Sequence, residues 1–271
     1  MSYDIINTEI FNMINPITYD NLCIIFSESR LSKYLSATNE DKIEALKLYT
    51  LNMSLSESLY SFLCVFEIAL RNRISNVLVK EFGDNWFEEK AGKWLNGKAA
   101  TEWHDKNGNT QRARLLKQID KAKEEINKQN KKINNPQYHK LLTSDTLTPE
   151  LNFGFWTEIM GSDYDRIIWH IVSPRYIHEV FPNAPEKHNL MRDIKRIRRI
   201  LNEIRVIRNR VFHHEPVFNT RNLSFDELLT TYENAKKLLG WLSEDALCFF
   251  EENNQFEKLV NSIPSSMRSL S

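Results

Sequence analysis

The chain has 271 residues, of which 41% are hydrophobic and 27% charged, and its 36 basic side chains balance 36 acidic ones. This length and apolar content suffice for a sizeable core and exclude a disordered protein. Only 7 glycines and 8 prolines are present, too few for the turns of many-stranded sandwiches or barrels and for glycine-rich nucleotide loops. The composition therefore predicts an all-α protein.

The cysteines and the N-terminus indicate a cytoplasmic protein. Cys23, Cys64 and Cys248 form no CxxC pair, which excludes a disulfide framework and a four-cysteine zinc site. Residues 1–15 contain no Lys or Arg, and no uninterrupted apolar run reaches the length of about 18 residues expected of a membrane span. We therefore expect reduced thiols, no export signal and no membrane anchor.

The zero net charge is the sum of blocks of opposite sign. Residues 90–140 hold 13 basic and 5 acidic side chains (+8), and residues 187–221 hold 10 and 3 (+7), while the other segments are acidic. Two basic blocks on a neutral chain can form a positive surface that suits nucleic acid. Packing of each basic helix beside an acidic one explains the same distribution, and both readings stay open.

Residues 40–82 predict two helices. Asn39 can cap a helix over Glu40–Met53, and Ser54 or Ser56 can cap a second one that ends at Gly83. The second helix is expected to be buried on more than one side, because its apolar residues include Leu59, Leu63, Phe66 and Leu70.

The middle of the chain is expected to carry a basic, Trp- and Lys-rich insertion at about 88–140. Tryptophans and glycines alternate there and indicate a loop: Trp86, Gly92, Trp94, Gly97, Trp103 and Gly108. A helix should follow over Gln111–Lys132, before Asn135-Pro136. Its apolar residues form one narrow stripe, which predicts a rim helix with a large solvated face: Leu115, Ile119, Ala122 and Ile126.

Prolines punctuate the next segment. Thr148 and Pro149 fit the cap and first position of a helix, and the aromatic residues that follow are expected in the core: Phe153, Phe155 and Trp156. The three prolines of 174–185 predict a segment that is largely loop.

Two long helices should complete an antiparallel bundle, which we take as one domain over residues 1–271. The first is an Arg-rich helix over His188–His214 that Glu215-Pro216 ends. Its apolar residues are Leu190, Ile194, Ile197, Leu201, Ile204 and Phe212. The second runs over about Ser224–Asn253, with Leu228, Leu229, Ala235, Leu238, Leu239 and Leu242 on its apolar face. The tail after Pro264 is expected to fray.

The residues most suited to chemistry stand at the end of the Arg-rich helix. Arg208, Asn209 and His213 lie within six residues, and Asn209 and His213, four apart, share one helical face. A long arginine side chain can bring its guanidinium round to the imidazole five positions later.

This pattern resembles the Arg-x(4–6)-His signature of the HEPN superfamily, and within it the chain looks like the bacterial abortive-infection (Abi-like) family. Two further segments resemble that family: Leu63–Asn72, similar to its N-terminal helix, and Asn152–Trp156, similar to its central Gly-Phe-Trp segment. The resemblance implies a helical endoribonuclease of phage defence that cleaves RNA without a metal or other cofactor. It also implies a homodimer that completes the site, and an antitoxin or another defence protein as a possible partner.

The residue types fit that chemistry by themselves. A 2′-hydroxyl would attack the adjacent phosphate, His213 could move a proton, and Arg208 could hold the phosphate and its growing charge. Asn209 would orient the phosphate or His213. Basic residues of the same helix are candidates for RNA binding: Arg198, Arg199, Arg205 and Arg210.

Four further residues are candidates for supporting roles. The resemblance suggests that Glu67, Arg71 and Asn72 approach the motif helix, whereas a Glu67–Arg71 ion pair inside the bundle is the simpler explanation of that spacing. His214 points about 100° away from His213 and is expected to cap or pack. Adjacent histidines without a carboxylate or histidine at i+4 do not form a metal-ligand pattern. The other histidines are expected to be structural or on the surface: His104, His139, His170, His178 and His188.

Two other functions remain open. A non-catalytic RNA-binding or regulatory module would keep the basic helix, although binding alone needs no histidine at position 213. A structural protein that pairs its Arg-rich helix with an acidic one at a dimer interface would explain the charge blocks equally well. Whether Arg208 and His213 face an accessible groove or an ion-pair network distinguishes these functions.

Overall fold

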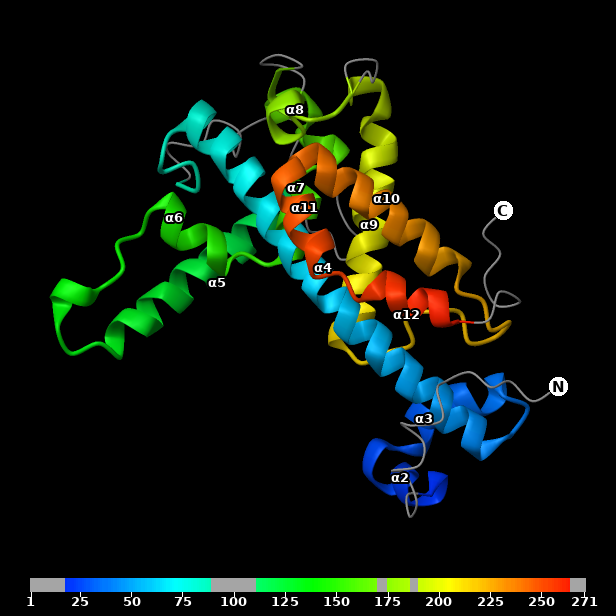
Figure 1. The fold of residues 1–271 in the computed structure, drawn as a ribbon. Helices are drawn as coiled ribbons and strands as arrows, with labels where there is room; N and C mark the ends of the chain where they lie inside the picture. The colour runs from blue at the N-terminus through cyan, green and yellow to red at the C-terminus, as the bar shows by residue number, and fades with distance from the viewer. Residues whose placement is uncertain (1–17, 89–110, 170–174, 186–189, 264–271) are drawn as a thin grey trace. The chain divides into compact units, whose positions relative to one another are not determined.

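Helices account for nearly all regular structure in the part of the chain that the computed structural model describes, residues 18–88, 111–169, 175–185 and 190–263 (Figure 1). The α-helices are α2 (Tyr19–Phe26), α3 (Glu28–Ala37), α4 (Lys42–Phe82), α5 (Gln111–Lys131), α6 (Ser144–Leu147), α7 (Phe153–Ile159), α8 (Arg175–Val180), α9 (Leu190–Phe212), α10 (Asp226–Leu242), α11 (Glu244–Glu252) and α12 (Phe256–Ser262). Short 3₁₀ or π turns cover Pro136–Tyr138, Thr148–Glu150, Ser162–Tyr164 and Asp165–Trp169. These ranges contain no β-strand, only an isolated bridge between Asn219 and Ser224. The predicted all-α helical bundle is confirmed.

The two helices predicted over 40–82 are one helix of 41 residues, α4. Asp41, rather than Asn39, caps it, because its Oδ1 accepts from the backbone N–H of Ile43 and Glu44 at 2.9 and 3.0 Å. No glycine or proline interrupts the run, and buried residues continue at helical spacing through the predicted break: Leu48, Leu51, Leu55, Leu59, Phe62 and Phe66. Gly83 ends α4 as expected, with φ +84°.

Contacts within the chain define two compact units with interleaved segments. Unit 1 comprises Met1–Val65, Val206–Lys236 and Cys248–Ser271, and unit 2 comprises Phe66–Arg205 and Lys237–Leu247. The helices α4, α9, α10 and α11 each contribute residues to both units.

Unit 1 is built around aromatic side chains. Phe62 of α4 packs edge-on against Tyr232 and Phe250, with ring centroids 5.4 and 5.1 Å apart. Phe218 and Phe225 lie on either side of the turn before α10, with their ring centroids 4.5 Å apart. Edge-to-face and tilted pairs of this kind add to the stability that burial of the rings provides.

The core of unit 2 gathers the segments around α5 and α7. The predicted stripe of α5 is buried, and the aromatic residues of α7 are buried as well: Leu115, Ile119, Ala122, Ile126, Phe153, Phe155 and Trp156. Trp86, expected in a loop, lies in a turn after α4 but is buried, 6.2 Å from Trp156 between ring centroids. Its indole N–H donates to Ser144 Oγ at 2.8 Å, so the buried ring has no orphaned donor.

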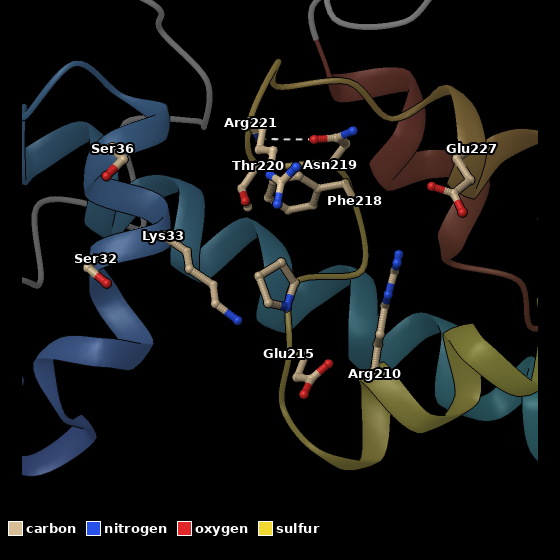
Figure 2. Close-up of a pocket in the computed structure, with 11 residues that line it drawn as sticks. Ser32, Lys33, Ser36, Arg210, Glu215, Phe218, Asn219, Thr220, Arg221 and Glu227 are labelled. Carbon is tan, nitrogen blue, oxygen red and sulfur yellow. Dashed lines mark hydrogen bonds between the residues drawn. The ribbon is translucent and has the colours of Figure 1, made fainter. Parts of the chain in front are cut away.

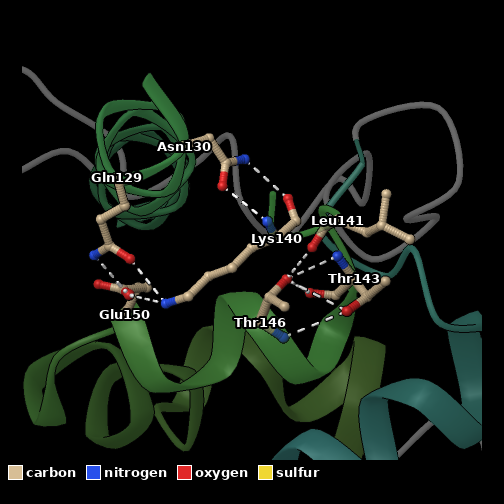
Figure 3. Close-up of polar contacts among 7 residues, drawn as sticks. All are labelled: Gln129, Asn130, Lys140, Leu141, Thr143, Thr146 and Glu150. Carbon is tan, nitrogen blue, oxygen red and sulfur yellow. Dashed lines mark hydrogen bonds and ion pairs between the residues drawn. The ribbon is translucent and has the colours of Figure 1, made fainter. Parts of the chain in front are cut away.

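Polar contacts fix the segment after α5 (Figure 3). Asn130 clasps the backbone of Lys140, accepting from its N–H at 2.8 Å and donating to its carbonyl at 2.9 Å. Lys140 Nζ in turn donates to Gln129 at 2.8 Å, and Thr143 and Thr146 form a reciprocal capping box at α6. The C-terminal half of the predicted basic insertion is therefore the helix α5 followed by a segment that hydrogen bonds hold against it.

Three other expected elements differ from the structure. Asn152, not Thr148, caps the helix that carries Phe155, and Thr148 is buried against Ser75. The segment 174–185, expected to be largely loop, contains α8, because Pro182 and Pro185 follow the helix rather than interrupt it. The last long helix is divided at Ser243, whose Oγ accepts from the N–H of Ala246 at 3.1 Å and caps α11.

Several predictions lie outside the described residues. These are the loop at 89–110 with Trp94, Trp103 and His104, and also His170, His188 and the tail after Pro264. Of the described helices, α4 alone is long and apolar enough to cross a membrane. Core helices of soluble proteins pass the same test. The helix α4 carries many buried apolar residues, but also exposed ones: Ile43, Met53, Tyr60 and Ile68.

Candidate functional site

The C-terminal end of α9 is closed by a Schellman motif. The N–H of Glu215 donates to the carbonyl of Arg210 at 2.8 Å, and the N–H of His214 donates to that of Val211 at 3.1 Å. His214 occupies the left-handed position of this motif, with φ +56°. Glycine is the usual residue there, so a histidine at this position strains the backbone by about 1 kcal/mol. The helix therefore ends at Phe212, two residues before the predicted end at His214.

Two side chains from distant parts of unit 1 hold the segment that follows α9. Arg30 of α3 donates through Nη1 to the carbonyl of His214 at 2.6 Å and to that of His213 at 3.4 Å. Asn52 of α4 is buried and accepts from the N–H of Val217 at 2.9 Å. Its amide also donates to the carbonyl of Glu215 at 3.4 Å. The backbone from His213 to Val217 is thus anchored by two side chains.

The guanidinium of Arg208 lies over the ring of Phe212, 4.0 Å from its centroid. Such a cation–π contact contributes about 0.5–2 kcal/mol and holds the planar group in one orientation. Phe212 is 42% exposed, whereas Ile204 and Val211 of the same helix are buried. The ring of Phe212 also packs against Tyr60 of α4, at 5.6 Å between centroids.

The other two motif residues lie at the surface. Asn209 and His213 are exposed, and the backbone N–H of His213 still donates to the carbonyl of Asn209 at 2.9 Å. His213 therefore follows the last helical residue directly, and its side chain is accessible to a molecule in solution.

Arg210 lines a cationic pocket of about 750 Å³ (Figure 2). Lys33 reaches into it from α3, and Arg221 comes from the loop before α10. No carboxylate of the described residues lies within 4.0 Å of any of these three cations, although Glu215 and Glu227 are in the wall. We call this space the cationic pocket.

An aromatic pocket of about 530 Å³ adjoins the same helix end. Its described lining residues are Tyr49, Asn52, Met53, Ser56, Glu57, Tyr60, Val211, Phe212 and His214. Arg208, Asn209 and His213 belong to the described lining of neither pocket. The motif thus ends beside two pockets of different chemistry, one cationic and one aromatic.

The other arginines predicted to bind RNA differ in their surroundings. Arg198 forms a close, partly buried ion pair with Asp165 and donates through Nε to the carbonyl of Met160 at 2.6 Å, contacts that compete with the expected one to RNA. Arg199 is exposed and pairs loosely with Glu203 at 3.5 Å. Arg205 is exposed and donates to Asn202 at 2.7 Å. Of the four, Arg210 is the one that lines a pocket.

Glu67, Arg71 and Asn72 belong to unit 2, on α4. Glu67 and Arg71 are half-buried, and Asn72 is exposed. The described contacts of Arg71 include no ion pair with Glu67, and its Nε is buried without a hydrogen-bond partner among the described residues. His214 does cap, as expected, but through its backbone. Among the remaining described histidines, His139 and His178 are exposed.

Sequence reasoning did not identify four residues of this region: Arg30, Lys33, Asn52 and Arg221. Each lies outside the motif, and none stands in a spacing that indicates a site. Asn52 gave one usable signal, because an amide in the apolar run of a buried helix requires a hydrogen-bond partner.

No group of three or more His, Cys, Asp or Glu side chains in the described ranges is placed as metal ligands would be. In comparisons with known proteins, the family model described as Abi-like protein matches residues 14–219. No curated protein and no solved structure is detectably similar to the chain.

Proposed function

The chain belongs to the Abi-like protein family, and from this premise we propose that it is a HEPN-type endoribonuclease that acts in abortive infection as a toxin of phage defence. The family suggests the abortive-infection setting. The end of α9 supports the enzymatic activity, because an exposed imidazole, a stacked guanidinium and a cationic pocket occur together there.

The observation that carries the proposal is the cationic pocket at the end of the motif helix, which Arg210 and Glu215 line. Lys33, Arg210 and Arg221 have no described carboxylate within salt-bridge distance, so their charges remain available to an anionic ligand. RNA supplies regularly spaced phosphates to such a surface. We assign Arg210 to this surface. Arg199 and Arg205, exposed residues of unit 2, are proposed as separate contacts to RNA. We leave Arg198 out because Asp165 occupies its guanidinium.

The proposed reaction needs no metal ion or cofactor. The 2′-oxygen attacks the adjacent phosphorus while the bond to the 5′-oxygen breaks, leaving a 2′,3′-cyclic phosphate and a 5′-hydroxyl. His213 moves one of the two protons, Arg208 stabilises the charge that grows on the phosphate, and Asn209 orients either group. One proton must leave the 2′-hydroxyl and another must reach the 5′-oxygen, and one imidazole serves one of these transfers at a time.

A homodimer would bring a second His213 to the same phosphate, with one imidazole for each proton. Two-fold contacts of this kind are self-complementary. Light scattering at micromolar concentration should report a dimer. A monomer with full nuclease activity would contradict this part of the proposal.

The test is cleavage of a single-stranded RNA by the purified full chain in the presence of EDTA. His213→Ala should lower the rate by about 10²–10⁴-fold with little loss of affinity, because a proton carrier is removed. Arg208→Ala should reduce both rate and affinity, since the guanidinium serves the bound phosphate and its transition state. Arg196→Ala, an exposed arginine earlier in α9, is the matched control and should cut like wild type.

Two further measurements separate this activity from a non-catalytic module. A 2′-deoxy residue at the cleaved position should abolish cutting, because the attacking hydroxyl is absent. The logarithm of RNA affinity should fall linearly with the logarithm of salt, by about 0.7 for each contacted phosphate. Binding with this salt slope but without cleavage, or cleavage that requires a divalent metal, would reject the mechanism and leave an RNA-binding module.

A further inference from the structure

The aromatic pocket is lined by two partly exposed aromatic rings beside the proposed site of cleavage. Tyr60 is 50% exposed and Phe212 is 42% exposed, and their ring centroids lie 5.6 Å apart. A volume of about 530 Å³ is in the range of pockets that bind small organic groups. Bases of single-stranded nucleic acids stack on exposed aromatic rings, because every base has a π-face.

The wall of this pocket also contains polar groups suited to the edge of a base. Ser56 Oγ is buried and has no hydrogen-bond partner among the described residues. Buried hydroxyls are nearly always hydrogen-bonded, so this one is a donor and acceptor that a bound molecule could satisfy. Glu57 and His214 stand in the same wall.

The backbone of His214 provides an independent indication. Its φ of +56° is one that glycine adopts without strain, yet a histidine occupies the position and its side chain lines the pocket. Strained residues are concentrated at binding and catalytic sites, where the side chain is needed in a particular place. Helix capping alone would be served better by glycine.

Phe212 links this pocket to the motif, because its ring contacts both Tyr60 and the guanidinium of Arg208. We propose that the aromatic pocket binds one nucleobase of the RNA, next to the phosphate held by Arg208, with Tyr60 as its stacking platform and His214 at its edge. This inference rests on the proposed function and names the part of the substrate that is recognised beside the cut.

The test measures equilibrium binding of ten-nucleotide strands of 2′-O-methyl RNA, which lack the attacking hydroxyl and cannot be cleaved by this mechanism. One strand is intact, and each of the others has a single abasic position. If one base occupies the pocket, one abasic position should weaken binding to the wild-type chain by about 5- to 150-fold. In Tyr60→Ala that penalty should vanish, while the salt dependence stays that of wild type. Tyr138→Ala, an exposed tyrosine of unit 2, should keep the full penalty.

His214→Gly separates a ligand contact from a structural role. The substitution relieves the left-handed strain, so its melting temperature should equal or exceed that of wild type, and the abasic penalty should shrink nonetheless. A penalty unchanged in both Tyr60→Ala and His214→Gly would overturn the nucleobase assignment and leave the proposed ribonuclease standing. A change in the monomer–dimer equilibrium of Tyr60→Ala with an unaltered penalty would overturn it in favour of an interface between copies. Failure of the wild-type chain to bind RNA at low salt would overturn both proposals.

Discussion

Asn52 is the residue whose replacement should most clearly disturb the site without touching the motif. Its side chain is 3% exposed, and its Oδ1 accepts a hydrogen bond of 2.9 Å from the N–H of Val217, a residue that is itself buried. Removing the acceptor leaves that donor without a partner, at a cost of about 1–3 kcal/mol. Loss of the longer bond to the Glu215 carbonyl, at 3.4 Å, adds about 0.5–1 kcal/mol. The higher helix propensity of alanine offsets about 0.5 kcal/mol of this loss in the free energy of unfolding.

We therefore expect Asn52→Ala to lower the free energy of unfolding by about 1–3.5 kcal/mol, measured by urea denaturation followed by circular dichroism. RNA cleavage should fall as well, because the backbone after His213 loses an anchor. Asn76→Ala is the control, an exposed asparagine of the same helix, which should be neutral or slightly stabilising. Equal stabilities of the two variants would refute the argument that Asn52 holds this segment.

Three further predictions concern stability elsewhere in the chain. Gly83→Ala should destabilise by about 1 kcal/mol, because the position has φ +84° although a Cβ would meet no atom within 4 Å, and thermal unfolding measures this. Arg198→Ala should lower the free energy of unfolding, measured by urea denaturation, by about 1.5–3 kcal/mol, because the charged hydrogen bonds of Arg198 are partly buried. Replacing the exposed Arg199 with alanine should change the free energy of unfolding by less than about 0.5 kcal/mol. Burial opposes the charge on Lys236, but two glutamate partners outweigh it and raise its pKa. The stability difference between wild type and Lys236→Met should therefore be constant at neutral pH and shrink only as the pH rises above about 10.4, the ordinary lysine pKa, in a series of urea titrations.

The sequence by itself determined the helical class and most of the buried faces. Regular spacing of apolar residues is a local property, so the stripe of α5 and the apolar face of α10 could be read directly. The end of α9 near Glu215-Pro216 and the stop at Gly83 follow from backbone restrictions of single residues. Arg208, Asn209 and His213 were identifiable because they are adjacent along the chain.

Tertiary structure decided what local signals could not. Ser54 and Ser56 resemble helix caps, but burial of the continuous apolar face of α4 outweighs their preference, whereas Ser243, in a run that reads as one helix, does act as a cap. The clasp of Asn52 on Val217 spans 165 residues and that of Arg30 on His214 spans 184. Partners so far apart leave no periodic trace in one sequence, because only the folded chain brings them within hydrogen-bond distance. For the same reason the cationic and aromatic pockets beside the motif became visible only in the structure, since their walls join α3 or α4 to the segment after α9.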